Sequence, residues 1–211
     1  MAARFPRSAR PTARRPYRSA GQATVRHGAQ RGQYPHGISL RPQLAVIAES
    51  MAEAVLSVGG WVFDQVLVGW DAMVLTADHT NARAALILGA RACSLEAAFA
   101  GAAPSARLAA VAVQADLYGR DARVRRMVLE LVQTSQAEVR FWGDPQPAEL
   151  SGMARPERHR LSSATQAFKA QAIVALPDLP ASAAGADPAR LSADAEMFCR
   201  ARLSGRNLVT A

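Results

Sequence analysis

The chain has 211 residues, which is enough for one domain with a sizeable core and a tail. Half of the residues are hydrophobic, yet no apolar segment is long and unbroken enough to predict a transmembrane helix. The net charge of +8 is unevenly placed: residues 1–42 hold nine Arg and no acidic residue, whereas residues 43–211 hold sixteen Lys and Arg against seventeen Asp and Glu. The basicity therefore belongs to the N-terminal segment.

This segment, residues 1–42, is rich in Pro, Ser, Gly and Arg and poor in large apolar side chains, so it is predicted to be disordered. Its charge predicts contacts with nucleic acid or an acidic protein, with Arg14, Arg15 and Arg18 as candidates. Two other interpretations stay open, namely a solvated tail without function and upstream sequence from a misassigned start codon. No apolar segment follows the arginines, so no export signal is recognised and a cytoplasmic location is expected.

The first predicted elements are two helices and a strand. Pro42 suits the first turn of a helix, and apolar residues recur every three or four positions from Leu44 to Val58. The pair Gly59-Gly60 is expected to break this helix. A second helical stripe then ends near Trp70, and residues 72–77 are short and apolar enough to form a buried strand.

In the middle of the chain, predicted strands alternate with predicted helices. Residues 86–88 are a candidate strand, and Ser94 is a candidate N-cap for a short helix. Residues 108–118 are expected to form an interior strand because of their Val and Ala content. Asp121 is expected to cap an amphipathic helix, and residues 138–142 alternate as a strand does.

The last third of the chain is predicted to hold two helices, one after a long loop and one after a linker. Residues 145–161 are expected to be a long polar loop, and Ser163 with Gln166 has the form of a capping box that opens a helix. Residues 177–188 are expected to link this helix to a C-terminal helix, and residues 206–211 to be a tail. The alternation predicts one α/β domain over residues 43–205, with three layers and a mostly parallel sheet of about four strands.

The candidate ligand-binding residues are polar side chains that follow the predicted strands: Asp78, His79, Asp116 and Asp144. In α/β sheets ligands gather at the carboxyl ends of strands, so these groups would converge if their strands were neighbours. The alternative is that each acidic residue caps a helix or sets a turn. Arg155, Arg158 and Arg160 are candidate contacts for an anionic partner, and Trp61 and Trp70 are candidates for a homodimer interface or for the core.

No motif identifies a reaction. Cys93 and Cys199 have no metal-binding spacing and are expected to be unpaired thiols, and neither a dinucleotide nor a P-loop glycine motif occurs, so no metal or cofactor is predicted. The sequence does not decide whether the chain is an enzyme, and the absence of a catalytic motif favours a protein that is not one. The favoured function is a non-enzymatic regulatory or interaction domain. The alternative is a small-molecule sensor or enzyme that uses the Asp and His residues at the strand ends.

Overall fold

The computed structural model describes residues 41–201 except residues 79–80, 102–107, 145–147, 151–153 and 177–192. The chain divides into two units, Met1–Ile38 and Ser39–Ala211, and every described residue belongs to the second. The predicted disorder of residues 1–42 and the contacts of Arg14, Arg15 and Arg18 thus fall almost wholly outside the described residues. Within the described part of the chain, no helix is long and apolar enough to cross a membrane.

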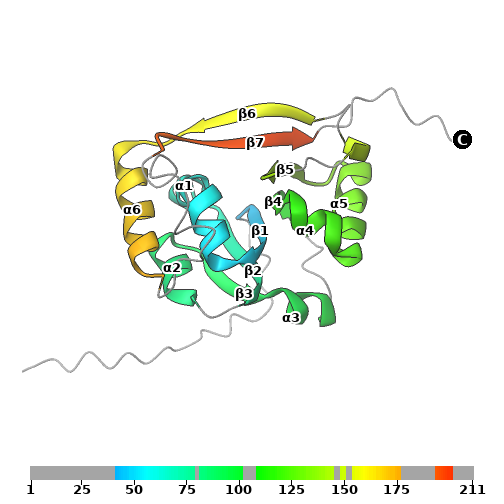
Figure 1. Ribbon diagram of the computed structural model, residues 1–211, viewed down its shortest axis with the longest axis horizontal. Coiled ribbons are helices and arrows are strands. Elements are labelled where there is room, and N and C mark those ends of the chain that lie inside the picture. The colour runs from blue at the N-terminus through cyan, green and yellow to red at the C-terminus, as the bar shows by residue number, and fades with distance from the viewer. Residues whose placement is uncertain are drawn as a thin grey trace, which may run out of the picture. The chain divides into compact units, whose positions relative to one another are not determined.

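The centre of the domain is a seven-stranded mixed sheet with the order β3-β2-β1-β4-β5-β7-β6 (Figure 1). Strands β1 to β5 pair in parallel, whereas β7 is antiparallel to both β5 and β6. The α/β class stands, but the prediction of about four mostly parallel strands is wrong. The missed strands are β1, β3, β6 and β7. Residues 86–88, which were predicted to form a strand, lie at the end of helix α2 and just after it, and the strand β3 follows at Arg91–Ser94.

The first half of the domain repeats a strand–helix unit three times. Its elements are β1 (Gln43–Ser50), α1 (Met51–Leu67), β2 (Asp71–Asp78), α2 (Ala82–Ile87), β3 (Arg91–Ser94) and α3 (Leu95–Ala100).

The predicted helix over residues 43–58 is in fact a strand followed by the start of a helix. Five consecutive residues of β1, Leu44 to Ala48, are buried because helices cover both faces of a central strand. Ser50 then begins α1, and its hydroxyl accepts a hydrogen bond from the Glu53 backbone N–H at 3.2 Å. The Gly59-Gly60 pair lies inside α1 and does not break it.

The second half supplies the remaining strands of the sheet. Its elements are β4 (Leu108–Gln114), α4 (Ala115–Arg120), α5 (Ala122–Thr134), β5 (Glu138–Trp142), the short 3-10 helix η1 (Ala148–Leu150), β6 (Ala154–Arg160), α6 (Ser163–Val174) and β7 (Ala195–Ala201).

Two differences from the predicted elements enlarge the sheet. Strand β6 occupies part of the predicted polar loop, and β7 lies where the C-terminal helix was expected. β6 is an edge strand and is largely exposed, so its sequence lacks the apolar alternation that marks a strand. Two local predictions are confirmed, because Ser94 and Asp121 cap α3 and α5 as expected.

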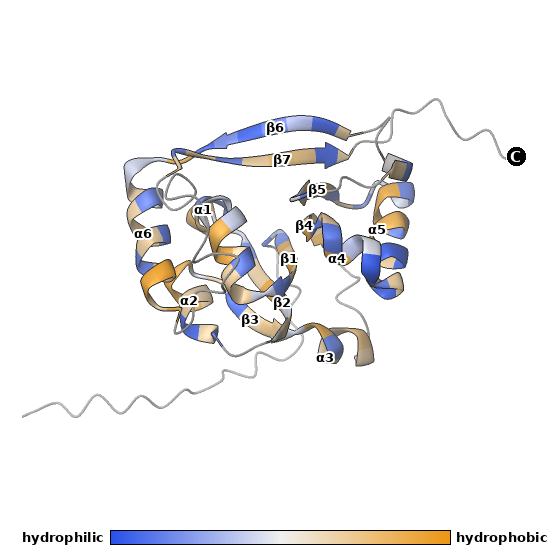
Figure 2. Ribbon diagram, viewed as in Figure 1, coloured by the Kyte–Doolittle hydropathy of each residue, from blue (hydrophilic) through white to orange (hydrophobic). Residues whose placement is uncertain are grey.

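Helices cover both faces of the sheet and form two apolar clusters (Figures 1 and 2). Helices α1, α2 and α6 pack on one face, and α3, α4 and α5 pack on the other. Trp61 lies in the first cluster with 2% of its surface exposed, and Trp70 packs at the margin of that cluster. The structure therefore gives Trp61 a place in the core.

Candidate functional site

The first candidate region is the carboxyl edge of the parallel strands, between β1 and β4. These two strands are neighbours, but the chain leaves them on opposite sides of the sheet, because α1 packs on one face and α4 on the other. In open α/β sheets, ligands bind outside the strand ends at a divergence of this kind.

One guanidinium joins the two strand ends. Arg120, at the end of α4, donates to the Glu49 carboxylate at 2.9 Å and forms an ion pair with Asp116 at 2.7 Å. About half of each of these three side chains is exposed. The hydrogen bond to Glu49, helped by the charges of Glu49 and Asp116, raises the pKa of Arg120.

Backbone and amide groups complete this cluster, which we call the β1/β4 rim (Glu49, Gln114, Asp116 and Arg120). The side-chain oxygen of Gln114 accepts a hydrogen bond from the backbone N–H of Glu49 at 2.8 Å. Because Gln114 is the last residue of β4, this bond ties the two strand ends together. The rim therefore presents carboxylate oxygens and guanidinium N–H groups side by side, with the charged groups open to solvent.

The residues predicted from the sequence to form this site are spread along the edge. Asp78 ends β2 and pairs in register with Ser50, whereas the side chain of Asp78 and all of His79 lie outside the described residues. Asp144 is exposed just after β5. The strands β2 and β5 are three positions apart, or roughly 14 Å at about 4.8 Å per strand. The structure thus brings Asp116 to Glu49 and Arg120, and leaves Asp144 at a distance from Asp78.

Sequence reasoning missed Glu49, Gln114 and Arg120. A strand over residues 43–50 would have placed Glu49 at a strand end, but the residues were interpreted as a helix. Among the described residues, no three His, Cys, Asp or Glu side chains lie close enough together to hold a metal ion.

A second polar group flanks the rim on α4 and α5. The Tyr118 hydroxyl donates to Glu149 at 3.1 Å, and Arg125 donates to the same carboxylate oxygen at 3.0 Å. Burial, followed by the hydrogen bond to Glu149, raises the pKa of Tyr118 to about 12. Tyr118 therefore stays protonated at neutral pH and acts as a hydrogen-bond donor.

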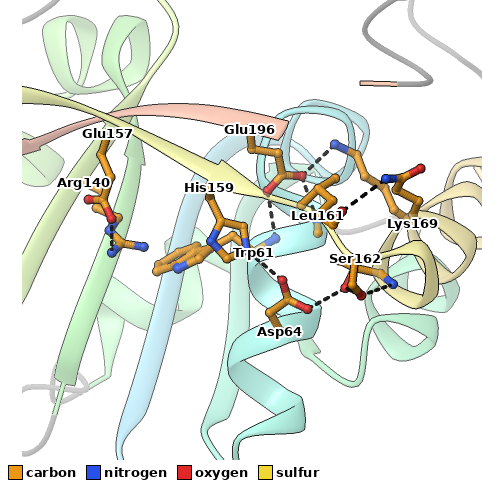
Figure 3. A network of polar contacts seen from close by, with 12 residues as sticks. Trp61, Asp64, Arg140, Glu157, His159, Leu161, Ser162, Lys169 and Glu196 are labelled. Carbon is orange, nitrogen blue, oxygen red and sulfur yellow. Dashed lines mark hydrogen bonds and ion pairs between the residues drawn. The ribbon is translucent and has the colours of Figure 1, made fainter. Parts of the chain in front are cut away.

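A buried network lies on the other side of the molecule, where β6 and β7 meet α1 and α6 (Figure 3). Glu196 is 3% exposed and accepts three hydrogen bonds: from Lys169 at 2.6 Å, and from the backbone N–H groups of Gly60 and Trp61 at 2.8 Å each. A buried carboxylate is tolerated only when it is paired and hydrogen-bonded in this way. This group joins β7, α6 and the middle of α1.

A hydrogen-bonded chain of four side chains lies beside it (Figure 3). The Nε2 atom of His159 lies 2.7 Å from Asp64, Thr165 donates to Asp64 at 2.6 Å, and the Ser162 and Thr165 hydroxyls lie 2.7 Å apart. Ser162 also caps α6. Each member is held by the next, so the chain fastens β6 and α6 to α1.

Arg140 lies further along the same face, beneath β6. Its guanidinium is 4.7 Å from the ring centre of Trp61 and pairs with Glu138 and Glu157 at 2.7 and 3.0 Å. A pocket of about 420 Å³ opens nearby at the amino end of β5, with the Glu138–Arg200 ion pair in its wall. This pocket is at the opposite edge of the sheet from the β1/β4 rim.

The arginines predicted to meet an anionic partner lie on β6. Arg155, Arg158 and Arg160 are exposed, and of these Arg158 pairs with Asp194 at 3.0 Å. They belong to a strand and not to the expected loop.

Comparisons with known proteins bear on the fold. No family model matches the chain, and no curated protein matches it. Solved structures that are similar include the A40926 pseudoaglycone deacetylase Dbv21, with 16% identity and a TM-score of 0.47 over 75% of this chain and 96% of that chain. A deacetylase in complex with teicoplanin has 13% identity and a TM-score of 0.47 over 76% and 98%. A conserved protein from Thermus thermophilus has 15% identity and a TM-score of 0.41 over 63% and 77%.

These comparisons correct one prediction. Proteins of similar fold are named as deacetylases, which are enzymes, so the prediction of a non-enzymatic regulatory or interaction domain is wrong and is not carried further. At TM-scores below 0.5 the likeness assigns neither a substrate nor a reaction to this chain.

Proposed function

We propose that the chain binds a small polar molecule at the β1/β4 rim. The observation that carries the proposal is the sharing of Arg120 between Glu49 and Asp116, which come from the ends of the two strands where the sheet order reverses. This is the place where open α/β sheets hold their ligands. No reaction is assigned to the site.

The chemistry of the rim selects the class of ligand. Two carboxylates accept hydrogen bonds from hydroxyl or ammonium groups, and the remaining N–H groups of Arg120 donate to an ether, carbonyl or hydroxyl oxygen. The rim carries two negative charges and one positive charge at neutral pH, so it disfavours multiply charged anions. A compact molecule with several hydroxyl groups, or with hydroxyl and amino groups, fits this set.

The proposal is tested with a panel of three probes: a neutral monosaccharide, an aminosugar and a nucleoside triphosphate. We expect millimolar or tighter binding of at least one of the first two by isothermal titration calorimetry, and none of the triphosphate. The substitutions Glu49→Gln and Asp116→Asn should each weaken that binding about tenfold, because each replaces an ionised acceptor by a neutral one.

Glu130→Gln is the matched control, because Glu130 is an exposed glutamate on α5 away from the rim. Equal loss of binding in this control, or tight binding of the triphosphate alone, would remove the proposed ligand class. No binding of any probe would count against the rim as a ligand site.

Three expectations from the sequence are kept as predictions beside this one. They are the contacts of residues 1–42 with nucleic acid or an acidic protein, a homodimer, and a cytoplasmic location.

A further inference from the structure

Strand β6 forms one edge of the sheet and, among the described strands, has a single neighbour, β7. Its other side is therefore a row of backbone groups that no described strand pairs with. An exposed edge of this kind is where another extended segment can add to a sheet.

The alternation of the pairing shows which groups face outward. Pro156 has no N–H and pairs in register with Cys199, so this pair is of the kind that exchanges no hydrogen bonds. In agreement, Leu161, which has the opposite parity, donates its N–H inward to Asp194 at 2.8 Å. The N–H groups of Arg158 and Arg160, which share the parity of Pro156, therefore point to the open edge.

The side chains of these same residues form an uncovered surface. Glu157 and His159 contact groups beneath the strand, so Arg158 and Arg160 lie on the face turned away from α1. Both are exposed, and Met197, which is opposite Arg158 in register, is 59% exposed. No described helix packs on this face, and Figure 2 shows β6 as hydrophilic along most of its length. We call Arg158, Arg160 and Met197, with the open edge beside them, the β6 surface.

Charge decides which occupant fits. Pairing of β6 with the β6 strand of a second copy would place arginines against arginines, and like charges directly opposite destabilise a sheet. The two arginines lie about 6.8 Å apart, the distance between alternate residues of a strand. An acidic side chain at every second position of an added strand would meet both. Met and Arg are also residues that are enriched at protein interfaces.

We propose that the β6 surface binds an extended acidic segment of a partner protein, which adds as a strand along Arg158 and Arg160. Backbone hydrogen bonds to the two outward N–H groups supply affinity, and the arginines select carboxylates at alternate positions. Pro156 ends the added pairing, because it offers no donor. The Arg158–Asp194 pair does not stand in the way, because both side chains are more than half exposed and such pairs are weak.

The probe is a fluorescein-labelled heptapeptide of alternating glutamate and threonine, titrated with the full chain and followed by fluorescence anisotropy. A second peptide of the same sequence with N-methylated glutamates has the same charge but lacks the backbone N–H donors that would face β6. Any binding by the basic N-terminal segment is common to both peptides. We expect the unmodified peptide to bind about tenfold more tightly than the N-methylated peptide.

The variant Arg158→Glu/Arg160→Glu should abolish this tenfold preference. Arg83→Glu/Arg126→Glu is the matched control, with the same change in charge at exposed arginines on α2 and α5, and should keep it. Unchanged thermal unfolding of both variants confirms that they are folded.

Three outcomes would overturn the proposal. The first is equal binding of the two peptides by the unaltered chain. The second is an equal loss of the peptide preference in Arg158→Glu/Arg160→Glu and in the control variant. The third is a different occupant: a twelve-nucleotide single strand that binds with the same dependence on Arg158 and Arg160, or a dimer in sedimentation that only Arg158→Glu/Arg160→Glu dissociates.

Discussion

Glu196 is the residue on which three elements converge. Its carboxylate receives Lys169 from α6 and two backbone N–H groups from the middle of α1, and all of these groups are shielded from water. Lys169 depends on Glu196 more than Glu196 depends on Lys169, because Glu196 keeps the two backbone donors when the lysine is removed.

The asymmetry of this pair gives the first prediction. Glu196→Gln should lower the free energy of unfolding by about 3–5 kcal/mol, because it leaves the Lys169 ammonium buried without a counter-charge. Lys169→Met should cost less than Glu196→Gln. Urea unfolding followed by tryptophan fluorescence measures both, and the reverse order would contradict this account. Asp194→Asn, at an exposed pair, serves as the control, with an expected change of at most about 0.5–1 kcal/mol.

Gly60 is the residue that allows Glu196 to reach the helix backbone. A Cβ atom at this position would lie 2.5 Å from Leu161 Cδ2 and 3.1 Å from the Glu196 carboxylate. Glycine within a helix ordinarily costs about 0.5–1 kcal/mol relative to alanine, so close packing outweighs helix propensity here.

The second prediction follows from that contact. Gly60→Ala should destabilise the protein by about 1–3 kcal/mol, because the added methyl group displaces Leu161, which is buried. Gly119→Ala is the matched control, since nothing lies within 4 Å of its would-be Cβ in α4, and it should be neutral or stabilising. Chemical denaturation of both variants decides the question. Equal effects would show that the space around Gly60 is not limiting.

At the scale of elements, local capping determines where several helices begin. Asp121 accepts the backbone N–H groups of Arg123 and Val124 at the start of α5, at 2.8 and 3.4 Å. The hydrogen bond from the Arg123 side chain, with those from the backbone, lowers the pKa of Asp121. Such a cap can be recognised from sequence because every one of these partners lies within three residues.

The cap of α5 gives the third prediction. Asp121→Ala should lower the free energy of unfolding by about 1 kcal/mol at pH 7. Because the folded-state pKa is lowered, this stabilisation is fully present above the ordinary value of 3.8 and is lost as the pH falls through the folded-state value. Urea unfolding at pH 7, 5 and 3 should therefore show the gap between wild type and variant closing only at the lowest pH. Asp144→Ala, at an exposed position, should show little change at any of them. A gap that is independent of pH would contradict the role of the ionised cap.

At the scale of the whole molecule, β7 holds the sheet together from the end of the described chain. It lies between β5 and β6, carries Glu196, and packs Phe198 against Trp61 at 5.4 Å between ring centres. Strand β6 has no other neighbour among the described strands.

The position of β7 gives the fourth prediction. Removal of residues 193–211 should abolish cooperative thermal unfolding, because β5 and β6 both lose a partner and Lys169 loses its counter-charge. Removal of residues 1–38 is the comparison and should leave the transition in place, because the described core lies entirely in the unit Ser39–Ala211. Circular dichroism follows both, and a cooperative transition in the shortened C-terminal variant would refute the role given to β7.

The sequence by itself determined the features that depend on near neighbours in the chain. The α/β class, the strands β2 and β5, and the caps at Ser94 and Asp121 follow from apolar runs and from side chains that meet backbone groups a few residues away. Asp116 was also recognised as a residue near a strand end.

Only the tertiary structure decided the rest, because it depends on contacts that local pattern does not record. The apolar residues of β1 have the spacing of a helix. Only the pairing of β1 with a strand on each side makes it a central strand. Strands β6 and β7 alternate only weakly, and they are strands because they pair with each other across a long gap in sequence. The rim residues Glu49 and Arg120 are 71 positions apart, and only the parallel pairing of β1 with β4 brings them together.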